Sequence, residues 1–174
     1  GTAGDSVTLP AGSAYRFSAD FTVEMWFYMN ALNTYSLLYS TWPGSGTGSL
    51  EIQIRSAISN KIRTWYNSGS AFDSSTSLST GQWYHLALTR SGTTVTRWLN
   101  GTSDGTMTLS GQMGRDDQTI KIGADGSSYT FNGYIDDMRV TNGVARYTST
   151  FTPPTTAHLT SAGDVNKQII INSA

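Results

Sequence analysis

The sequence lacks cysteine and carries few charged side chains, which make up 13% of its 174 residues and sum to a formal net charge of −1. Without cysteine, the chain cannot form disulfides, thiolate nucleophiles or zinc sites built on cysteine. Charge this sparse and balanced gives no basic patch for nucleic acid. No segment approaches the ~20 consecutive apolar residues that span a bilayer. We therefore expect neither nucleic-acid binding nor membrane insertion.

Residue types that serve catalysis are also scarce, because the chain has two glutamates, Glu24 and Glu51, and two histidines, His85 and His158. Glycoside hydrolysis uses two carboxyl groups about 5 to 10 Å apart, whereas the glutamates lie on different predicted strands with no acidic residue nearby in sequence. His85 sits at an alternating strand position, which favours a buried structural role. His158 lies in a polar tail, where we expect it to be solvated. No Gly-x-Ser-x-Gly turn is present, and the sequence predicts that the protein is not an enzyme.

Serine, threonine, glycine and asparagine take the place of charged residues, around clusters of aromatic and β-branched side chains. With 37% hydrophobic and 11% aromatic residues, the chain has enough apolar surface to fold, which excludes a disordered chain. Short strands separated by turn residues are typical of this composition. It favours an all-β protein.

Alternation of apolar and polar residues predicts ten to twelve short strands. The strongest, Phe21–Met29, is apolar on both faces, as expected of a strand covered on both sides. Two hairpins are predicted, 49–55 with 61–66 and 83–90 with 94–99, and Asn100-Gly101 after the second is typical of a tight turn. Further strands are expected at residues 5–9, 36–41, 119–123, 131–141 and 167–172, and the only helical turn expected lies at 144–147.

So many antiparallel strands in one domain imply two packed sheets, because a single sheet would leave an apolar face in water. We therefore predict an all-β, two-sheet antiparallel β-sandwich of jelly-roll type.

Five segments, in this order, resemble the laminin G-like domains of the concanavalin A-like lectin/glucanase class. They are DFTVEMWFY at 20–28, GQWYHLALTR at 81–90, WLNGT at 98–102, IKIG at 120–123 and FNGYIDDMRV at 131–140. A sixth, TNGVARYTSTFTPP at 141–154, resembles the variant found in bacteriophage tail and structural proteins and in large bacterial surface proteins. The resemblance covers residues 1–154 and implies the concanavalin A-like jelly roll.

We treat residues 1–174 as one laminin G-like domain in which 155–174 form a C-terminal extension. Members of the family begin with a strand that precedes a turn, whereas this sequence begins at the turn, Gly1–Asp5. The resemblance implies that a strand at 167–172 supplies the missing first strand. It would pair either with its own sheet or with the next copy in a fibre, since an unpaired sheet edge favours either arrangement.

The resemblance also implies one structural calcium ion. In related sandwiches, an aspartate in a strand ending Asp-x-x-Arg-Val holds calcium, and Asp136 occupies that place in DDMRV at 136–140. Calcium takes six to eight oxygen ligands, so backbone carbonyls from elsewhere would complete the shell. The alternative is that Asp136 accepts backbone hydrogen bonds and Asp137 faces water.

Aromatic side chains near predicted loops are candidates for stacking on sugar rings, with neighbouring amides reading the hydroxyls. Trp26, Trp83 and Trp98 are assigned to the fold instead, because they lie in the family segments. The alternative is that all five tryptophans pack in the sandwich. The candidate ligand-binding residues are Trp42, Trp65, Tyr66, Asn67, Tyr129 and Asn132.

These observations predict a non-catalytic extracellular, cell-surface or virion module that binds glycans or a cell-surface receptor in adhesion. The first alternative is a structural or assembly subunit of a fibre, filament or capsid, which contacts copies of itself or a parent phage or surface assembly through the C-terminal strand. The second alternative is a polysaccharide-active enzyme.

Overall fold

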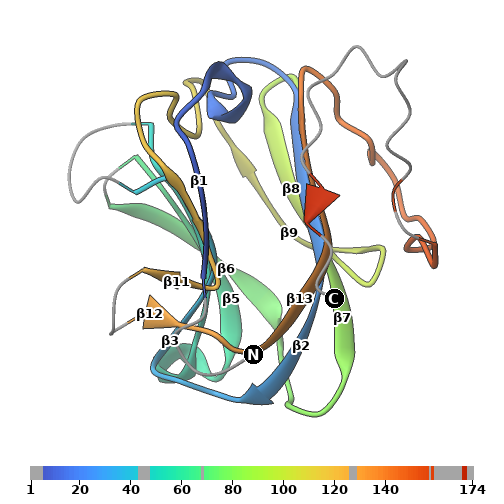
Figure 1. Cartoon of the computed structure of the whole chain (residues 1–174). Coiled ribbons are helices and arrows are strands. Elements are labelled where there is room, and N and C mark those ends of the chain that lie inside the picture. The colour runs from blue at the N-terminus through green and yellow to red at the C-terminus, as the bar shows by residue number, and fades with distance from the viewer. Residues whose placement is uncertain are drawn as a thin grey trace.

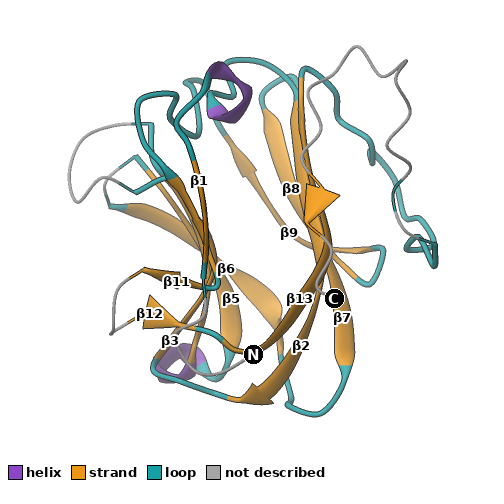
Figure 2. Ribbon diagram, in the orientation of Figure 1, coloured by secondary structure: helices purple, strands orange, loops and turns teal. Residues whose placement is uncertain are grey.

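Two six-stranded antiparallel sheets face each other in the computed structural model, which describes residues 6–42, 48–67, 69–125, 129–156, 158 and 170–171 (Figures 1 and 2). Sheet 1 has the order β1 (Val7–Leu9), β10 (Ile120–Ile122), β3 (Tyr35–Ser40), β4 (Leu50–Arg55), β5 (Lys61–Tyr66) and β6 (Ser70–Ser77). Sheet 2 has the order β14 (Ile170–Ile171), β13 (Asn132–Asn142), β2 (Phe21–Ala31), β7 (Trp83–Ser91), β8 (Thr94–Leu99) and β9 (Thr102–Thr108). This confirms the predicted two-sheet β-sandwich.

Four small elements complete the described part of the chain. β11 (Ala124–Asp125) and β12 (Tyr129–Thr130) form a separate antiparallel pair beside β3, at the left of Figure 1. Two short 3-10 helices, η1 (Ser13–Tyr15) and η2 (Ser56–Ile58), join strands. Among the described residues, no helix is long and apolar enough to cross a membrane.

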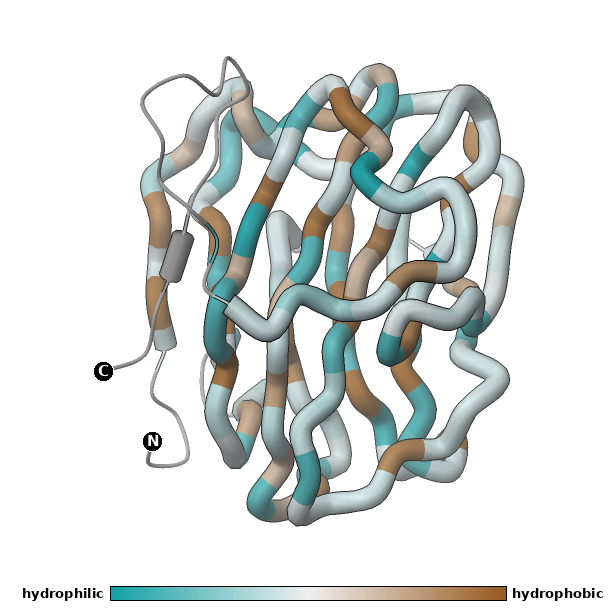
Figure 3. Tube along the Cα trace, turned by 90° about the vertical axis from the view of Figure 1, so that its right-hand side faces the viewer, coloured by the Kyte–Doolittle hydropathy of each residue, from teal (hydrophilic) through white to brown (hydrophobic). Residues whose placement is uncertain are grey.

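The core lies between the sheets and follows from the period-two alternation of the strands. Figure 3 shows brown segments interspersed with pale and teal ones along several strands. In β2, Phe21, Val23, Met25 and Phe27 are fully buried against sheet 1. Burying a side chain of this size contributes about 1.5–3 kcal/mol. The residues between them, including Glu24, therefore point to the outer side of sheet 2.

One buried charge crosses the core. Arg97 in β8 is fully buried and its guanidinium donates hydrogen bonds to Thr64 Oγ1 in β5, to the Phe72 carbonyl in β6 and to the Asp104 carbonyl in β9. Burial lowers the pKa of Arg97 to about 10, so the side chain stays charged at neutral pH. Arg97 thus ties the two sheets together at the β5–β6 end of the sandwich.

Residues 143–156 and 158, which we call the strap, run along the outer side of sheet 2 (orange in Figure 1). Thr22 Oγ1 donates to the Val144 carbonyl, the Phe151 amide donates to the Gly101 carbonyl, and Trp26 Nε1 donates to the Pro154 carbonyl. The outward face of β2 is therefore covered from Thr22 to Trp26, in agreement with the two-sided apolarity of 21–29. The helical turn expected at 144–147 is wrong, because these residues bond to sheet 2 instead of to one another.

At the edge of sheet 2, β14 pairs antiparallel with β13 of the same chain, with Ile171 opposite Met138 and Ile170 opposite Arg139. The rest of the strand expected at 167–172 lies outside the described residues. Its assignment as the family's first strand, and the extension 155–174 as a whole, stay predictions.

Among the strands longer than two residues, β6 and β9 were not predicted. Their residues, such as Ser74–Ser77, are mostly serine and threonine and lack the apolar alternation that marks a half-buried strand. They form because neighbouring strands supply hydrogen-bonding edges on which a polar segment can pair.

Gly101→Ala is expected to destabilise the fold more than Gly92→Ala. Both glycines have positive φ angles, 81° and 60°, so either alanine costs about 1 kcal/mol. A Cβ at Gly101 would also lie 1.9 Å from the Phe151 carbonyl oxygen, whereas one at Gly92 meets no atom within 4 Å. We expect Gly101→Ala to lower the free energy of unfolding by at least about 2 kcal/mol, measured by urea denaturation. Equal losses in the two variants would show that the strap does not contact this turn.

Candidate functional site

The outward face of β4 forms a polar floor on sheet 1. Glu51, Gln53 and Arg55 point outward because the alternate residues of β4 are buried in the core. β5 pairs with β4 in a register that places Trp65 directly opposite Glu51. One aromatic ring and three polar side chains therefore share one surface of the hairpin.

Three further aromatic side chains lie around this floor. Tyr35 at the start of β3 and Tyr129 in β12 have ring centroids 4.9 Å apart, which holds the β11–β12 pair against sheet 1. Trp42 follows β3, and its backbone N–H donates to Ser40 Oγ at 2.9 Å. These contacts place rings from three separate segments beside Trp65.

Together these residues line two adjoining depressions of about 450 Å³ and 370 Å³, which share Trp42, Glu51 and Tyr129. We call the pair the groove. Its remaining lining residues are Gln118, Thr119, Lys121 and Asp125 in the larger depression and Tyr35, Gln53, Arg55, Trp65 and Gly69 in the smaller.

The acidic groups of the groove have polar partners within it. Glu51 accepts hydrogen bonds from Ser40 Oγ and Gln53 Nε2, both at 3.1 Å. Burial, and to a lesser extent the charge of Asp125, raise the pKa of Glu51. Asp125 forms an ion pair with Lys121. The larger depression therefore offers carboxylate and amide groups for hydrogen bonding without a large net charge.

The structure brings three of the predicted ligand-binding residues, Trp42, Trp65 and Tyr129, together in the groove. Tyr66 follows Trp65 in β5, so it points to the other side of the sheet and packs against the core. Asn67 accepts a hydrogen bond from the Gly48 amide, and Asn132 starts β13 in sheet 2.

Sequence reasoning missed the polar half of the groove. The hairpin 49–55/61–66 was predicted, and its register alone puts Glu51 beside Trp65. The same two-residue alternation, continued from Glu51 along residues 49–55, would have placed Gln53 and Arg55 on this surface as well. Tyr35, Lys121 and Asp125 come from distant segments, and no local pattern connects them to this surface.

The expected structural role of two tryptophans agrees with their contacts. Trp98 is buried and donates to Thr89 Oγ1, and Trp26 donates to the strap. Trp83 is 44% exposed on the outer face of sheet 2, where its ring lies 5.6 Å from that of Tyr28. Not all five tryptophans pack inside the sandwich.

Asp136 lies where β13 bulges against β2. An extra residue enters β13 between Asp136 and Arg139, and Asp137 has a φ of 47°. Asp136 Oδ1 accepts the Asp137 amide at 2.8 Å, and Asp137 is buried and does not face water. Within the described ranges, no group of three or more histidine or acidic side chains is placed to hold a metal ion. Because backbone carbonyls also bind calcium, the calcium expected at Asp136 stays a prediction of the resemblance.

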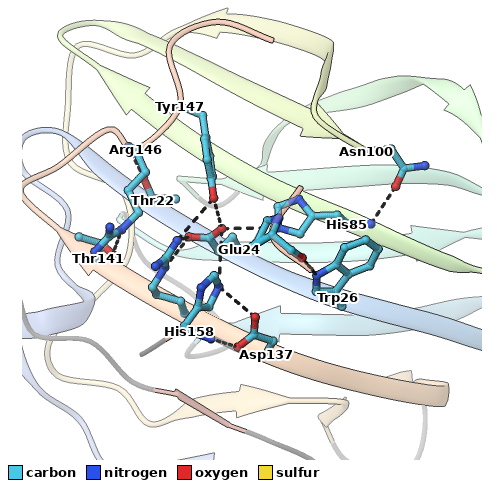
Figure 4. A network of polar contacts seen from close by, with 12 residues as sticks. Thr22, Glu24, Trp26, His85, Asn100, Asp137, Thr141, Arg146, Tyr147 and His158 are labelled. Atoms are coloured by element: carbon cyan, nitrogen blue, oxygen red, sulfur yellow. Dashed lines mark hydrogen bonds and ion pairs between the residues drawn. The ribbon is translucent and has the colours of Figure 1, made fainter. Parts of the chain in front are cut away.

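The outer face of sheet 2 holds a buried polar network centred on Glu24 (Figure 4). Arg139 Nε donates to Glu24 Oε1 at 2.6 Å, and the Tyr147 hydroxyl donates to Glu24 Oε2 at 2.7 Å. His85 Nε2 lies 3.5 Å and His158 Nε2 3.8 Å from the same Oε2. Burial alone would raise the pKa of Glu24, but the contacts with His85, Arg139 and Tyr147 outweigh it and lower the pKa.

Both histidines belong to this network. His85 is fully buried, as expected, although the strap covers it on the outer side of sheet 2 and it does not lie between the sheets. The expectation that His158 is solvated is wrong. Its side chain is 4% exposed, its Nε2 lies 3.4 Å from Asp137 Oδ2, and its amide donates to Asp137 Oδ1. Because the Glu24 carboxylate and both imidazoles are almost completely buried, we assign the network to holding the strap.

Comparison with known proteins agrees with this architecture. A laminin G family model, described as the concanavalin A-like lectin/glucanases superfamily, matches residues 1–158. A search of curated protein sequences gave no match.

Solved structures of similar fold include domain 4 of AbnA, a GH43 extracellular arabinanase from Geobacillus stearothermophilus, in complex with arabinotriose (21% identity, 80% of this chain and 68% of that chain, TM-score 0.64). A protein of Bacteroides ovatus described as carbohydrate-binding has 19% identity over 83% of this chain (TM-score 0.65), and domains LG4-5 of the mouse laminin alpha1 chain have 15% over 78% (TM-score 0.55). The chain spans only 43% and 40% of these last two. At such identities the likeness shows the fold alone.

His158→Gln is expected to reduce the loss of stability on acidification. Burial lowers the pKa of His158 in the folded protein below its ordinary value of 6.5, so the unfolded chain takes up the proton first. The stabilisation from neutral His158 is therefore complete above about pH 6.5 and is lost as the pH falls through the lower folded-state pKa. Urea denaturation between about pH 7 and pH 5 measures it.

The pH dependence of the variant must be compared with that of the wild type, because Glu51 changes the stability of the fold in the opposite direction as the pH falls. Its raised pKa makes the folded state the better proton acceptor, which adds stability as the pH falls. If the free energy of unfolding falls equally with pH in His158→Gln and in the wild type, protonation of the buried His158 imidazole does not contribute to the loss of stability.

Proposed function

The chain belongs to the laminin G family of the concanavalin A-like lectin/glucanases superfamily, and from this premise we propose that it is a non-catalytic module that binds glycans in the groove of sheet 1. The observation that carries the proposal is the ring of four aromatic side chains, Tyr35, Trp42, Trp65 and Tyr129, around a polar floor. Two of the similar structures are described as an arabinotriose complex and as carbohydrate-binding, which supports the class of ligand.

The chemistry of the groove suits a sugar chain. Pyranose and furanose rings present C–H faces that pack on aromatic rings, and their hydroxyls need donors and acceptors. Gln118 supplies both donor and acceptor, and Glu51 and Asp125 supply carboxylate acceptors. Because strands of a packed sandwich hold Glu51, Gln53 and Trp65, little ordering is needed when the ligand binds.

A shallow site of this kind binds one glycan weakly, and repeated copies raise the affinity through avidity. We therefore propose that the module acts as part of a larger extracellular, cell-surface or virion protein, such as a phage or bacterial surface protein. There it would attach to glycans or to glycosylated receptors.

Trp65→Ala and Trp42→Ala are each expected to weaken glycan binding at least about tenfold, because a lost stacking contact of about 1.5 kcal/mol corresponds to that factor. The measurement is calorimetric titration with the best ligand from a panel of neutral and acidic oligosaccharides that includes arabinotriose. Trp83→Ala is the matched control, because it removes an exposed tryptophan from the opposite sheet. Equal binding by all three variants would refute the groove as the site.

Polysaccharide hydrolysis is a second candidate function, favoured by one observation. Glu51 and Asp125 line the same depression, and the pKa of Glu51 is raised, as a general acid requires. Against it, Lys121 pairs with Asp125, and hydrogen bonds from Ser40 and Gln53 occupy both oxygens of Glu51.

The wild-type protein is expected to release no reducing ends from the polysaccharides that it binds, measured by a reducing-sugar assay over hours. Glu51→Gln keeps the shape of the side chain and removes its acid. Release by the wild type that Glu51→Gln abolishes would replace the binding proposal with hydrolysis.

A further inference from the structure

Arg55 differs from the other arginines in the described part of the chain, because no hydrogen bond or ion pair joins its guanidinium to another residue. Its Nε is buried and has no acceptor. The other seven each contact an acidic side chain, a hydroxyl or a backbone carbonyl: Arg16, Arg63, Arg90, Arg97, Arg115, Arg139 and Arg146. Arg55 therefore carries a charge that nothing in this part of the protein neutralises.

Two aromatic rings hold the Arg55 guanidinium in place. Its central carbon lies 4.6 Å from the ring centroid of Tyr35 and 5.8 Å from that of Trp65. All three residues line the smaller depression of the groove. Cation–π contacts satisfy the faces of the guanidinium but leave its N–H groups free to donate. The result is an oriented donor group at the wall of a groove.

The charges of the groove are separated along β4. Glu51 lies four residues from Arg55 on the same face, which corresponds to about 13 Å along a strand. Asp125 is already paired with Lys121 at the Glu51 end. An anion beside Arg55 would therefore meet an unmatched positive charge, while the acidic groups lie about two sugar units away, where they can accept hydroxyls.

We propose that the groove is selective for anionic glycans, and that Arg55 binds the carboxylate or sulfate group of the sugar while the same or the next sugar ring stacks on Trp65. This inference rests on the proposed glycan-binding function. A guanidinium donates two parallel N–H bonds to such a group, and these charge-assisted bonds are stronger than bonds between neutral partners. The neutral part of the chain would extend toward Glu51 and Trp42.

The test is calorimetric titration with three matched pairs of probes: trigalacturonic acid and its methyl ester, sialyllactose and lactose, and a sulfated heparin trisaccharide and its desulfated form. We expect at least one acidic member to bind about tenfold or more tightly than the partner that lacks its free carboxylate or its sulfate. Arg55→Met should abolish that preference, because methionine keeps an apolar stem against Tyr35 but has no charge. The pair that responds identifies carboxylate or sulfate as the bound group.

Arg146→Gln is the control variant, since it removes the same charge from the strap on the opposite sheet and should leave the preference intact. For the wild type, raising the salt concentration should weaken binding of the acidic probe and leave a neutral probe unaffected, which tests the inference even if Arg55→Met does not fold.

Two outcomes would overturn the selectivity, namely equal affinity for the members of all three pairs, or an unchanged preference in Arg55→Met. If neutral glycans still bind in a manner sensitive to Trp65→Ala, the proposed function stands without it. Binding of no glycan, or binding indifferent to Trp65→Ala, refutes the proposed function itself.

Discussion

The burial of the Glu24 carboxylate determines how the outer side of sheet 2 is built. An ionised carboxylate removed from water costs several kcal/mol unless it is paired and hydrogen-bonded. Arg139 supplies one partner from the neighbouring strand, but Tyr147 and His158 come from the strap. The charge of Glu24 can therefore stay buried only when the strap lies across the sheet, and the strap in turn keeps water away from the carboxylate. Each condition depends on the other.

The bulge in β13 makes this arrangement possible. In a regular strand, Asp137 and Arg139 would lie on one face with a fixed spacing, and Asp136 on the other. The extra residue, with Asp137 at positive φ, shifts Arg139 opposite Glu24 and turns the Asp137 carboxylate toward His158. A local departure from ideal geometry thus supplies two of the contacts that hold a segment distant in sequence.

The fold could be predicted wherever one face of a strand is apolar, as in β2, β4 and β7, because burial itself creates the two-residue pattern. The groove could be predicted only in part. Trp65 was identified, but its neighbours Tyr66 and Asn67 were grouped with it, although alternation sends Tyr66 into the core. His158 was misplaced because its surroundings are polar in sequence, while its burial depends on Asp137 and Glu24, residues 21 and 134 positions away, and no local pattern contains that information.

The two outer faces of the sandwich differ in how an outward-pointing charge is paired, although the same two-residue alternation places a charged residue on each face. On sheet 2, the outward carboxylate of Glu24 meets a cation and three further polar partners beneath the strap, so these contacts add stability and the carboxylate is closed to solvent. On sheet 1, the outward guanidinium of Arg55 meets only the faces of two rings. A buried carboxylate that already accepts hydrogen bonds, as Glu24 does, has little free energy to gain from a ligand, whereas an oriented donor without an acceptor gains a hydrogen bond when one arrives. The sheet that leaves a charge unmatched, beside exposed aromatic surface, is therefore the one on which recognition is expected.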